Sequence, residues 1–200
     1  MKILAIGANG VIGQAVTNLL AQEHEVVAVG HSKGGFTVDI GDKESIRSLF
    51  EQIGEVDAII CMAGNGEMGE LDNLTDQHFS EVLNNKLMGQ INVARIGIEY
   101  LTKAGSITLT SGQAANNPFP GTTAIAVGVS GVNAFIQAAA TELKEGKRIN
   151  AVSPGIVKET LDAWGRDSSY GVPAKQVATY YRNSVLGQEN GHVFDAILSA

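Results

Sequence analysis

The chain has 200 residues, of which 44% are hydrophobic and 18% are charged, and its formal net charge is −7. This length suits one domain with a full hydrophobic core, spanning residues 1–200, and leaves no room for a separate substrate domain. The 14 Lys and Arg residues are not clustered, which excludes a nucleic-acid partner, because neutralising phosphates requires a concentrated basic patch.

The sequence shows no targeting, membrane or metal-binding signal. Four apolar residues follow Lys2 before the first glycine, too few for a signal peptide, and no apolar run approaches the roughly 18 residues that cross a bilayer. We therefore expect a cytoplasmic protein with no membrane partner. The single cysteine, Cys61, cannot form an internal disulfide and fits a small core residue at a strand end, and the four histidines lie too far apart to predict a metal site.

The first segment of the chain combines a strand, a glycine turn and a helix. An apolar strand over 2–6 runs into Gly7, Gly10 and Gly13, and an amphipathic helix follows over 11–22. Gly7 permits a tight turn, Gly10 lets the backbone approach a pyrophosphate, and Gly13 lets the helix pack closely on the strand. This order predicts a dinucleotide site; the alternative is a structural turn with no ligand.

The later segments alternate between strands and helices. Strands are predicted over 25–29, 36–40, 57–62, 106–110, 148–152 and 192–195, and helices over 42–53, 75–101, 121–143 and 173–186. The pattern predicts an α/β fold, a Rossmann-type doubly wound parallel sheet of about seven strands with helices on both faces. Only seven residues separate Val29 from Thr37. We therefore expect the second crossover helix to be missing and the third strand to be short and irregular.

Five stretches carry a resemblance to a known family: GANGVIG at 7–13, Asp39 in VDIGD, CMAGN at 61–65, SITLTSG at 106–112 and RINAVSPGIVKET at 148–160. In their order and in their residues, these stretches resemble the short-chain dehydrogenase/reductase family over almost the whole chain. The last stretch is the most specific, because in this family it borders the nicotinamide of the cofactor. The resemblance implies the same Rossmann-type fold and a nicotinamide dinucleotide cofactor.

The resemblance also implies which residues contact that cofactor. Gly7, Asn9, Gly10 and Ile12, backed by Gly13, would wrap the pyrophosphate; Asp39 and Ile40 would contact the adenine; Ala63, Gly64 and Asn65 the adenosine ribose; and Pro154, Gly155, Ile156 and Val157 the nicotinamide carboxamide. Two alternatives stay open. In the first, Asp39 caps the helix that starts near Asp42. In the second, the turn at 154–155 only ends a strand.

The end of the second predicted strand favours NADP over NAD. An acidic residue there accepts hydrogen bonds from a free ribose 2′-hydroxyl and repels a 2′-phosphate. This chain has no carboxylate at that position and offers His31, Ser32 and Lys33 instead. The alternative is that Lys33 is a solvated loop charge.

The catalytic residues depart from the family pattern. Members of the family use a serine, a tyrosine and a lysine, in which the tyrosine donates the proton and the lysine lowers its pKa. Ser111 stands where the resemblance places the serine, but Ile125 and Val129 stand at the tyrosine and lysine positions. No Tyr or Lys occurs between residues 106 and 143. The usual proton transfer is therefore impossible.

Lys86 is the candidate replacement, because it stands on the 75–101 helix where the family usually carries an asparagine. Its ammonium would bind the ribose hydroxyls or protonate a carbonyl oxygen to which Ser111 donates a hydrogen bond. The alternative is a solvated charge on a surface helix. Trp164 and Tyr170 lie in the segment 160–173, where the family has a substrate lid, and would either contact a ligand or pin the loop to the core.

Two classes of function follow. The first is an NADP-dependent oxidoreductase that transfers hydride between nicotinamide and a small carbonyl or alcohol with a non-standard proton donor. The second is a catalytically silent NADP-binding sensor or assembly protein. We favour the first because the nicotinamide-side residues are present. The small residues of 124–140 predict a homodimer or homotetramer, unless they pack only within the subunit.

Overall fold

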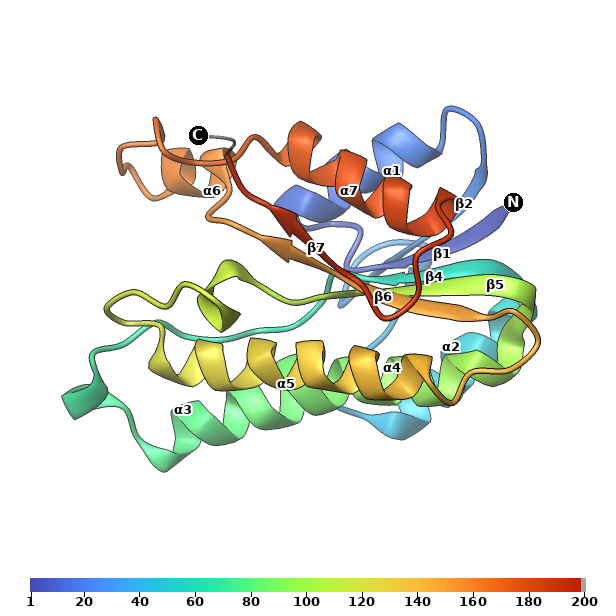
Figure 1. The fold of residues 1–200 in the computed structure, drawn as a ribbon, viewed down its shortest axis with the longest axis horizontal. Coiled ribbons are helices and arrows are strands. Elements are labelled where there is room, and N and C mark those ends of the chain that lie inside the picture. The colour runs from blue at the N-terminus through green and yellow to red at the C-terminus, as the bar shows by residue number, and fades with distance from the viewer. Residues whose placement is uncertain (199–200) are drawn as a thin grey trace.

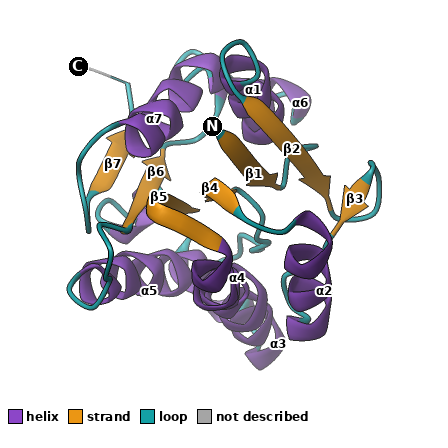
Figure 2. Cartoon of the chain, turned by 90° about the vertical axis from the view of Figure 1, so that its right-hand side faces the viewer, coloured by secondary structure: helices purple, strands orange, loops and turns teal. Residues whose placement is uncertain are grey.

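The computed structural model describes residues 1–198, which form one seven-stranded sheet with helices on both faces (Figures 1 and 2). The strand order is β3-β2-β1-β4-β5-β6-β7, and every neighbouring pair is parallel. The strands are β1 (Lys2–Ile6), β2 (Glu25–Gly30), β3 (Phe36–Thr37), β4 (Val56–Cys61), β5 (Leu101–Thr110), β6 (Arg148–Pro154) and β7 (Val193–Ala196). The predicted Rossmann-type fold is confirmed.

Helices cover the two faces of the sheet unequally (Figure 2). One face carries α1 (Val11–Leu20) and α7 (Ala174–Leu186), which lie side by side, and the short α6 (Lys158–Ala163) lies beyond them. The other face carries α2 (Lys43–Ile53), α3 (Asp76–Glu81), α4 (Met88–Gly97) and α5 (Thr123–Ala140). The sequence analysis did not predict α6, which runs into the segment 160–173 that it assigned to a substrate lid.

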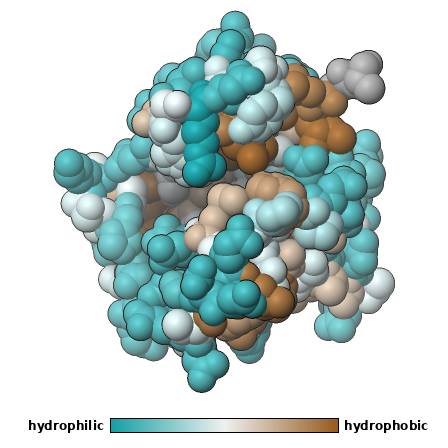
Figure 3. Space-filling view, turned by 90° about the vertical axis from the view of Figure 1, so that its left-hand side faces the viewer, coloured by the Kyte–Doolittle hydropathy of each residue, from teal (hydrophilic) through white to brown (hydrophobic). Residues whose placement is uncertain are grey.

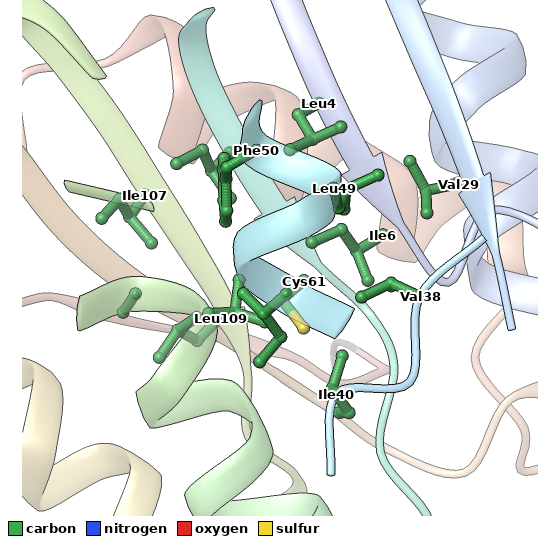
Figure 4. Close-up of a cluster of buried hydrophobic side chains, with 14 of the residues drawn as sticks. Leu4, Ile6, Val29, Val38, Ile40, Leu49, Phe50, Cys61, Ile107 and Leu109 are labelled. Atoms are coloured by element: carbon green, nitrogen blue, oxygen red, sulfur yellow. The ribbon is translucent and has the colours of Figure 1, made fainter. Parts of the chain in front are cut away.

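Successive side chains along each strand point to opposite faces of the sheet, so each face has its own hydrophobic core. Ile3 packs beneath α1 and α7, whereas Leu4 and Ile6 pack against α2 on the opposite face, where Phe50 is also buried (Figure 4). Burying one such side chain contributes about 1.5–3 kcal/mol to folding. Cys61 ends β4 inside this second core, as the sequence predicts.

The crossing from β2 to β3 has no helix, as expected. Residues 31–35 form an exposed loop, and β3 has only two residues where five were predicted. The amide of Val38 still donates to the carbonyl oxygen of Gly30, 3.0 Å away, before the chain turns away from the sheet. The side chain of Asp39 accepts from the amide of Gly41 at that turn, and Asp42, not Asp39, caps α2.

The helix predicted over 75–101 is interrupted. Residues Val82–Leu87 form one turn of π-helix between α3 and α4, and a short 3-10 turn follows α4 at Ile98–Tyr100. Thr75 is the N-cap and forms a reciprocal capping pair with His78, whereas Asp76 lies in the first turn. The fifth strand starts at Leu101 instead of 106, with a register irregularity before Ser106. π-Helical turns occur often at functional sites.

Among residues 1–198, α5 has the length and apolar composition of a membrane-spanning helix, with 18 residues and a mean hydropathy of 1.4. The expectation that no segment reaches this length is therefore wrong for α5. A helix that packs inside a folded domain passes the same test, and here Val132 and Ile136 of α5 are buried against the sheet. Of the large apolar side chains on α5, Val127 is exposed and the others are buried or partly buried.

Candidate functional site

The carboxyl ends of the central strands meet at one edge of the sheet, which Figure 3 shows from outside as a hollowed surface. The strand order reverses between β1 and β4, and such a reversal leaves a crevice in which ligands bind. Two adjoining cavities lie here: the crevice cavity, of about 330 Å³, and the Lys86 cavity, of about 230 Å³. Gly64 lines both of them.

The glycine turn forms the floor of the crevice cavity. Gly7 has a φ of +86°, and a Cβ atom there would stand 2.7 Å from the amide nitrogen of Ala63. A Cβ at Gly13 would collide with the backbone of Ala8, 2.8 Å away, so helix α1 approaches β1 as closely as the sequence analysis supposed. A Cβ at Gly10 meets only the carbonyl oxygen of Gly7, at 3.5 Å. Protein packing alone therefore does not require glycine at position 10.

The N-terminus of α1 opens beside this turn. No side chain caps its first amide groups, and Gly10 occupies the N-cap position. Free amides at a helix N-terminus, reinforced by the helix dipole, bind anions such as phosphate. The arrangement fits a pyrophosphate held on the backbone of the glycine turn.

The structure places nine of the predicted cofactor residues on the wall of the crevice cavity. They are Gly7, Asn9, Gly10, His31, Asp39, Ile40, Ala63, Gly64 and Asn65. Ile12 packs partly into the core beneath α1, and Ser32 and Lys33 lie in the exposed 31–35 loop outside the wall. Asn9 ties that loop to the glycine turn, because its side-chain amide donates to the carbonyl oxygen of Lys33, 2.8 Å away.

Asn85 lines the crevice cavity, and the sequence analysis did not single it out. Its side-chain oxygen accepts from the amide of Asn65 at 2.8 Å, which joins the loop after β4 to the π-helical turn. Only the run Asn84-Asn85-Lys86 in the sequence hinted at a polar junction here. Among residues 1–198, no cluster of His, Cys, Asp or Glu side chains could hold a metal ion.

The Lys86 cavity brings together both predicted catalytic residues. Lys86 and Ser111 line it, and so do Ile125 and Val129, which the sequence analysis places at the family's tyrosine and lysine positions. The side chain of Lys86 is half-buried, not solvated on a surface helix. Within the described chain its ammonium forms no hydrogen bond and no ion pair.

Two glycines make room for the lysine side chain. A Cβ at Gly64 would stand 2.7 Å from Cδ of Lys86, and a Cβ at Gly128 would stand 3.7 Å from its Cγ. Burial lowers the pKa of Lys86 from 10.5 to about 8, because desolvation disfavours the ammonium. Burial also raises the pKa of the neighbouring Cys61 thiol to about 11, which makes it a neutral core group.

Gln90 fixes the backbone of the π-helical turn at Lys86. Its side-chain amide donates to the carbonyl oxygens of Lys86 at 3.0 Å and Thr110 at 2.8 Å, and its oxygen accepts from the amide of Thr110 at 2.7 Å. The side chain is fully buried, so each of these bonds replaces water that cannot enter. The sequence analysis missed Gln90; its position one helical turn after Lys86 was the available signal.

Ser111 lies at the end of β5 on the far wall of the Lys86 cavity. Its amide donates to Val152 at 2.8 Å, which continues the pairing with β6, and its hydroxyl donates to the carbonyl oxygen of Val129 at 3.1 Å. The hydroxyl is buried, with the residue 3% exposed. Rotation about its C–O bond would aim the same proton into the cavity.

The predicted nicotinamide-side residues divide between cavity walls and packing. Pro154 lines the Lys86 cavity, and Ile156 lines a further cavity beyond it. A Cβ atom at Gly155 would stand 3.1 Å from Oε1 of Gln113. Val157 is buried at the position where α6 begins. The segment therefore ends β6 at Pro154 and contributes one residue to each of two cavities.

The parallel sheet with a glycine-lined crevice at its strand-order reversal defines a Rossmann-type α/β protein. A family model described as Enoyl-(Acyl carrier protein) reductase matches residues 4–189. A short-chain dehydrogenase/reductase of Stachybotrys chlorohalonatus is 31% identical, over 94% of this chain and 84% of its own length. The chain belongs to the short-chain dehydrogenase/reductase family, whose members are oxidoreductases that use a nicotinamide cofactor and act on small molecules.

Solved structures show the same similarity. A Listeria innocua protein superposes with a TM-score of 0.93 at 38% identity, covering 98% of both chains. A small-chain dehydrogenase crystallised in complex with NADPH superposes with a TM-score of 0.88 at 28% identity, covering 98% of this chain and 95% of its own. The versicolorin reductase 1 of Dothistroma septosporum is 28% identical over 78% of this chain, which spans only 63% of that relative.

Proposed function

We propose that this protein is an NADP-dependent oxidoreductase that reduces a small carbonyl compound, or oxidises the corresponding alcohol, with Lys86 in place of the family's tyrosine as proton donor. One observation carries the proposal. The Lys86 cavity holds an unpaired ammonium and the Ser111 hydroxyl, and it shares Gly64 with the crevice that fits the dinucleotide. A proton donor and a hydrogen-bond donor thus border the place where hydride transfer would occur.

Residues of the crevice cavity and the cavities beside it fit the parts of the cofactor in chain order. We assign the pyrophosphate to Gly7, Asn9 and Gly10, the adenine to Asp39 and Ile40, the adenosine ribose to Ala63, Gly64 and Asn65, and the nicotinamide side to Pro154 and Ile156. The open space above Gly10 and the uncapped start of α1 support the first assignment. Gly13, Gly155 and Val157 support these contacts through packing.

The preference for NADP rests on the loop after β2. His31 lines the crevice, while Ser32 and Lys33 stand beside it in solvent, where they would reach a 2′-phosphate without displacing core residues. No acidic residue occupies positions 30–35 to repel that phosphate. The NADPH bound in the 28% identical small-chain dehydrogenase is consistent with this preference.

Lys86 and Ser111 would share the proton chemistry. The bound nicotinamide supplies or accepts the hydride. In reduction, the ammonium of Lys86 gives its proton to the oxygen that becomes the alcohol, and the Ser111 hydroxyl donates a hydrogen bond to the same oxygen. A pKa of about 8 leaves Lys86 mostly protonated at neutral pH, yet lets it lose the proton easily. In oxidation, the neutral amine takes the alcohol proton.

One observation favours a silent NADP-binding protein as the second candidate. The hydroxyl of Ser111 already donates to Val129, and the residues at the tyrosine and lysine positions are apolar. If the serine keeps this bond in the complex, Lys86 is the one side-chain hydrogen-bond donor left among the residues that line the cavity. Such a protein would bind the nucleotide and would not turn over any carbonyl.

A homodimer or homotetramer is part of the proposal. The outer surface between α4 and α5 is hollowed by about 370 Å³ and lined by apolar residues that include Ala94, Ile98, Phe135 and Ala139. Small residues at exposed positions of α5, which include Ala134 and Ala138, permit close approach of a second copy, and Val127 of the same helix is also exposed. Sedimentation measurements would reveal the assembly.

Titration with NADPH and NADH, followed by nucleotide fluorescence, tests the cofactor. We expect NADPH to bind at least about tenfold more tightly, since a 2′-phosphate gains charge-assisted hydrogen bonds. Lys33→Glu should remove that preference, and Lys43→Glu on α2 should not. A carbonyl screen with NADPH then separates the two candidates: binding without any turnover supports the silent protein, and no binding of either nucleotide refutes both.

A further inference from the structure

A fourth cavity, of about 550 Å³, is lined in part by residues that follow β5 and β6; we refer to it as the outer cavity. The chain leaves β5 through Ser111 and Gly112, which line the Lys86 cavity, and then reaches Gln113, which lines the outer one. It leaves β6 in the same way, from Pro154 to Ile156. The same two chain segments therefore contribute to both cavities, and the volume of the outer cavity suits a small molecule.

The walls of the outer cavity combine apolar and aromatic side chains with two polar ones. They are formed by Met68, Phe119, Pro120, Ile156, Trp164 and Tyr170, with Gln113 and Arg166 as the polar side chains. Trp164 and Tyr170 are each 54% exposed, so they do not pin the loop to the core as one sequence alternative held. Large aromatic side chains left open on a concave surface are typical of ligand sites.

Hydrogen bonds hold two of these walls in place. The amide of Gly69 donates to the carbonyl oxygen of Gly121 at 2.9 Å, which ties the loop of Met68 to the loop of Phe119. The hydroxyl of Thr122 donates to the carbonyl oxygen of Phe119 at 2.6 Å. The loops that carry Met68 and Phe119 are therefore held by hydrogen bonds within the protein.

Arg166 stands at the rim with its charge unpaired. Its guanidinium carbon lies 5.4 Å from the centre of the Trp164 ring. Within residues 1–198 it forms no ion pair, and the adjacent Asp167 accepts from the amide of Ser169 at 2.9 Å. No acidic side chain lines the outer cavity. This places an available cation against an aromatic wall in a protein whose net charge is −7.

We propose that the outer cavity binds the body of the substrate, and that this substrate is an aromatic carbonyl or alcohol compound bearing a carboxylate. The ring would lie against Trp164 and Tyr170, and the carboxylate would take the two parallel hydrogen bonds of the Arg166 fork. The reacting carbon would point into the Lys86 cavity. The inference rests on the proposed oxidoreductase function, and it makes Arg166 the residue that determines specificity for charge.

The single tryptophan of the chain, Trp164, reports binding directly. The probes are 4-phenylbutyrate, its neutral amide and 4-phenylbutylamine, titrated into the full chain with and without NADP while tryptophan fluorescence is followed. We expect the carboxylate to bind about tenfold more tightly than the amide, as a hydrogen-bonded charge pair implies, and the amine to bind most weakly. Equal affinities of acid and amide, or no binding of the acid, overturn the proposal.

Variants show whether Arg166 is the cause. Arg166→Gln should reduce the preference for the acid to about twofold or less, and Arg166→Lys should retain part of it. Arg47→Gln, on the distant α2, removes the same charge and should leave the preference unchanged. A preference that survives in Arg166→Gln overturns the proposal. Because Arg166 is exposed, its replacement leaves folding intact, which circular dichroism verifies.

A parallel titration with NADPH tests the proposed oxidoreductase function separately from the proposed substrate. If NADPH binds and the acid shows no preference, the substrate inference fails while the proposed function stands. If the acid binds through Arg166 and NADPH does not bind, the oxidoreductase proposal fails while the anionic aromatic site stands.

Discussion

Replacing Lys86 by methionine is expected to stabilise the protein at neutral pH while it removes turnover. The lysine side chain lies between Gly64 and Gly128, its ammonium is unpaired, and burial lowers its pKa to about 8. Below that pH the folded protein contains a desolvated charge that the unfolded chain exposes to water, so charging opposes folding. Methionine has a similar length without the charge and would fill the same space.

The magnitude follows from the two pKa values. The pKa of Lys86 falls from 10.5 in the unfolded chain to about 8 in the fold, which at about 1.4 kcal/mol per pKa unit corresponds to roughly 3 kcal/mol. Partial exposure of the side chain reduces the expected gain to roughly 1–2 kcal/mol below pH 8. Between the two pKa values the unfolded chain binds more protons, so wild-type stability rises with pH and the advantage of the variant shrinks.

Urea unfolding followed by circular dichroism, at about pH 7 and about pH 9.5, measures this effect. Lys103→Met, at an exposed position on β5, is the matched control and should change stability by less than about 0.5 kcal/mol. With a substrate found by the carbonyl screen, Lys86→Met should reduce turnover by at least about 100-fold, as loss of a proton donor does. A variant less stable than wild type at pH 7, or a gain that does not change with pH, would refute the reasoning.

Three further predictions concern the same site. Gly10→Ala should cost about 1 kcal/mol or less of stability but weaken NADPH binding at least about tenfold. Gly13→Ala should cost roughly 1–3 kcal/mol of stability, because its Cβ meets backbone. Unfolding and nucleotide titrations distinguish the two variants, and equal stability losses would contradict the assignment. Gln90→Leu should cost roughly 2–4 kcal/mol by leaving buried backbone groups unpaired, while the exposed Gln77→Leu should be nearly neutral in the same unfolding assay. The rate of carbonyl reduction should fall above pH 8 as Lys86 loses its proton, and alcohol oxidation should rise there; a flat pH–rate profile would exclude Lys86 as the proton donor.

The sheet was predictable because its signals are local. Apolar strands separated by turns and helices require a parallel sheet, and strand boundaries in the sequence fall within a few residues of those observed for most strands. The missing helix between β2 and β3 followed from chain length alone, since 31–35 are too few residues to form one. The late start predicted for β5 was wrong, because residues Leu101–Gly105 lack a regular strand pattern and pair only loosely with β4.

The interruption of the predicted 75–101 helix depends on contacts from distant parts of the chain. Helical periodicity runs continuously through this segment, so nothing local signals the π-helical turn. Gln90 reaches across to the backbone of Thr110 on β5 and holds the carbonyl of Lys86 at the same time. Such a network exists only after β5 and the helix have packed together.

The sequence by itself determined the fold class, the family, the glycine turn and the candidates Lys86 and Ser111, because each depends on residue order within one short segment. Only the tertiary structure decided that Lys86 is half-buried between Gly64 and Gly128 and that Arg166 faces an aromatic cavity. These facts depend on which loops meet at the carboxyl edge of the sheet. Packing of segments far apart in sequence sets the solvent exposure and charge environment of a side chain, and no local pattern encodes it.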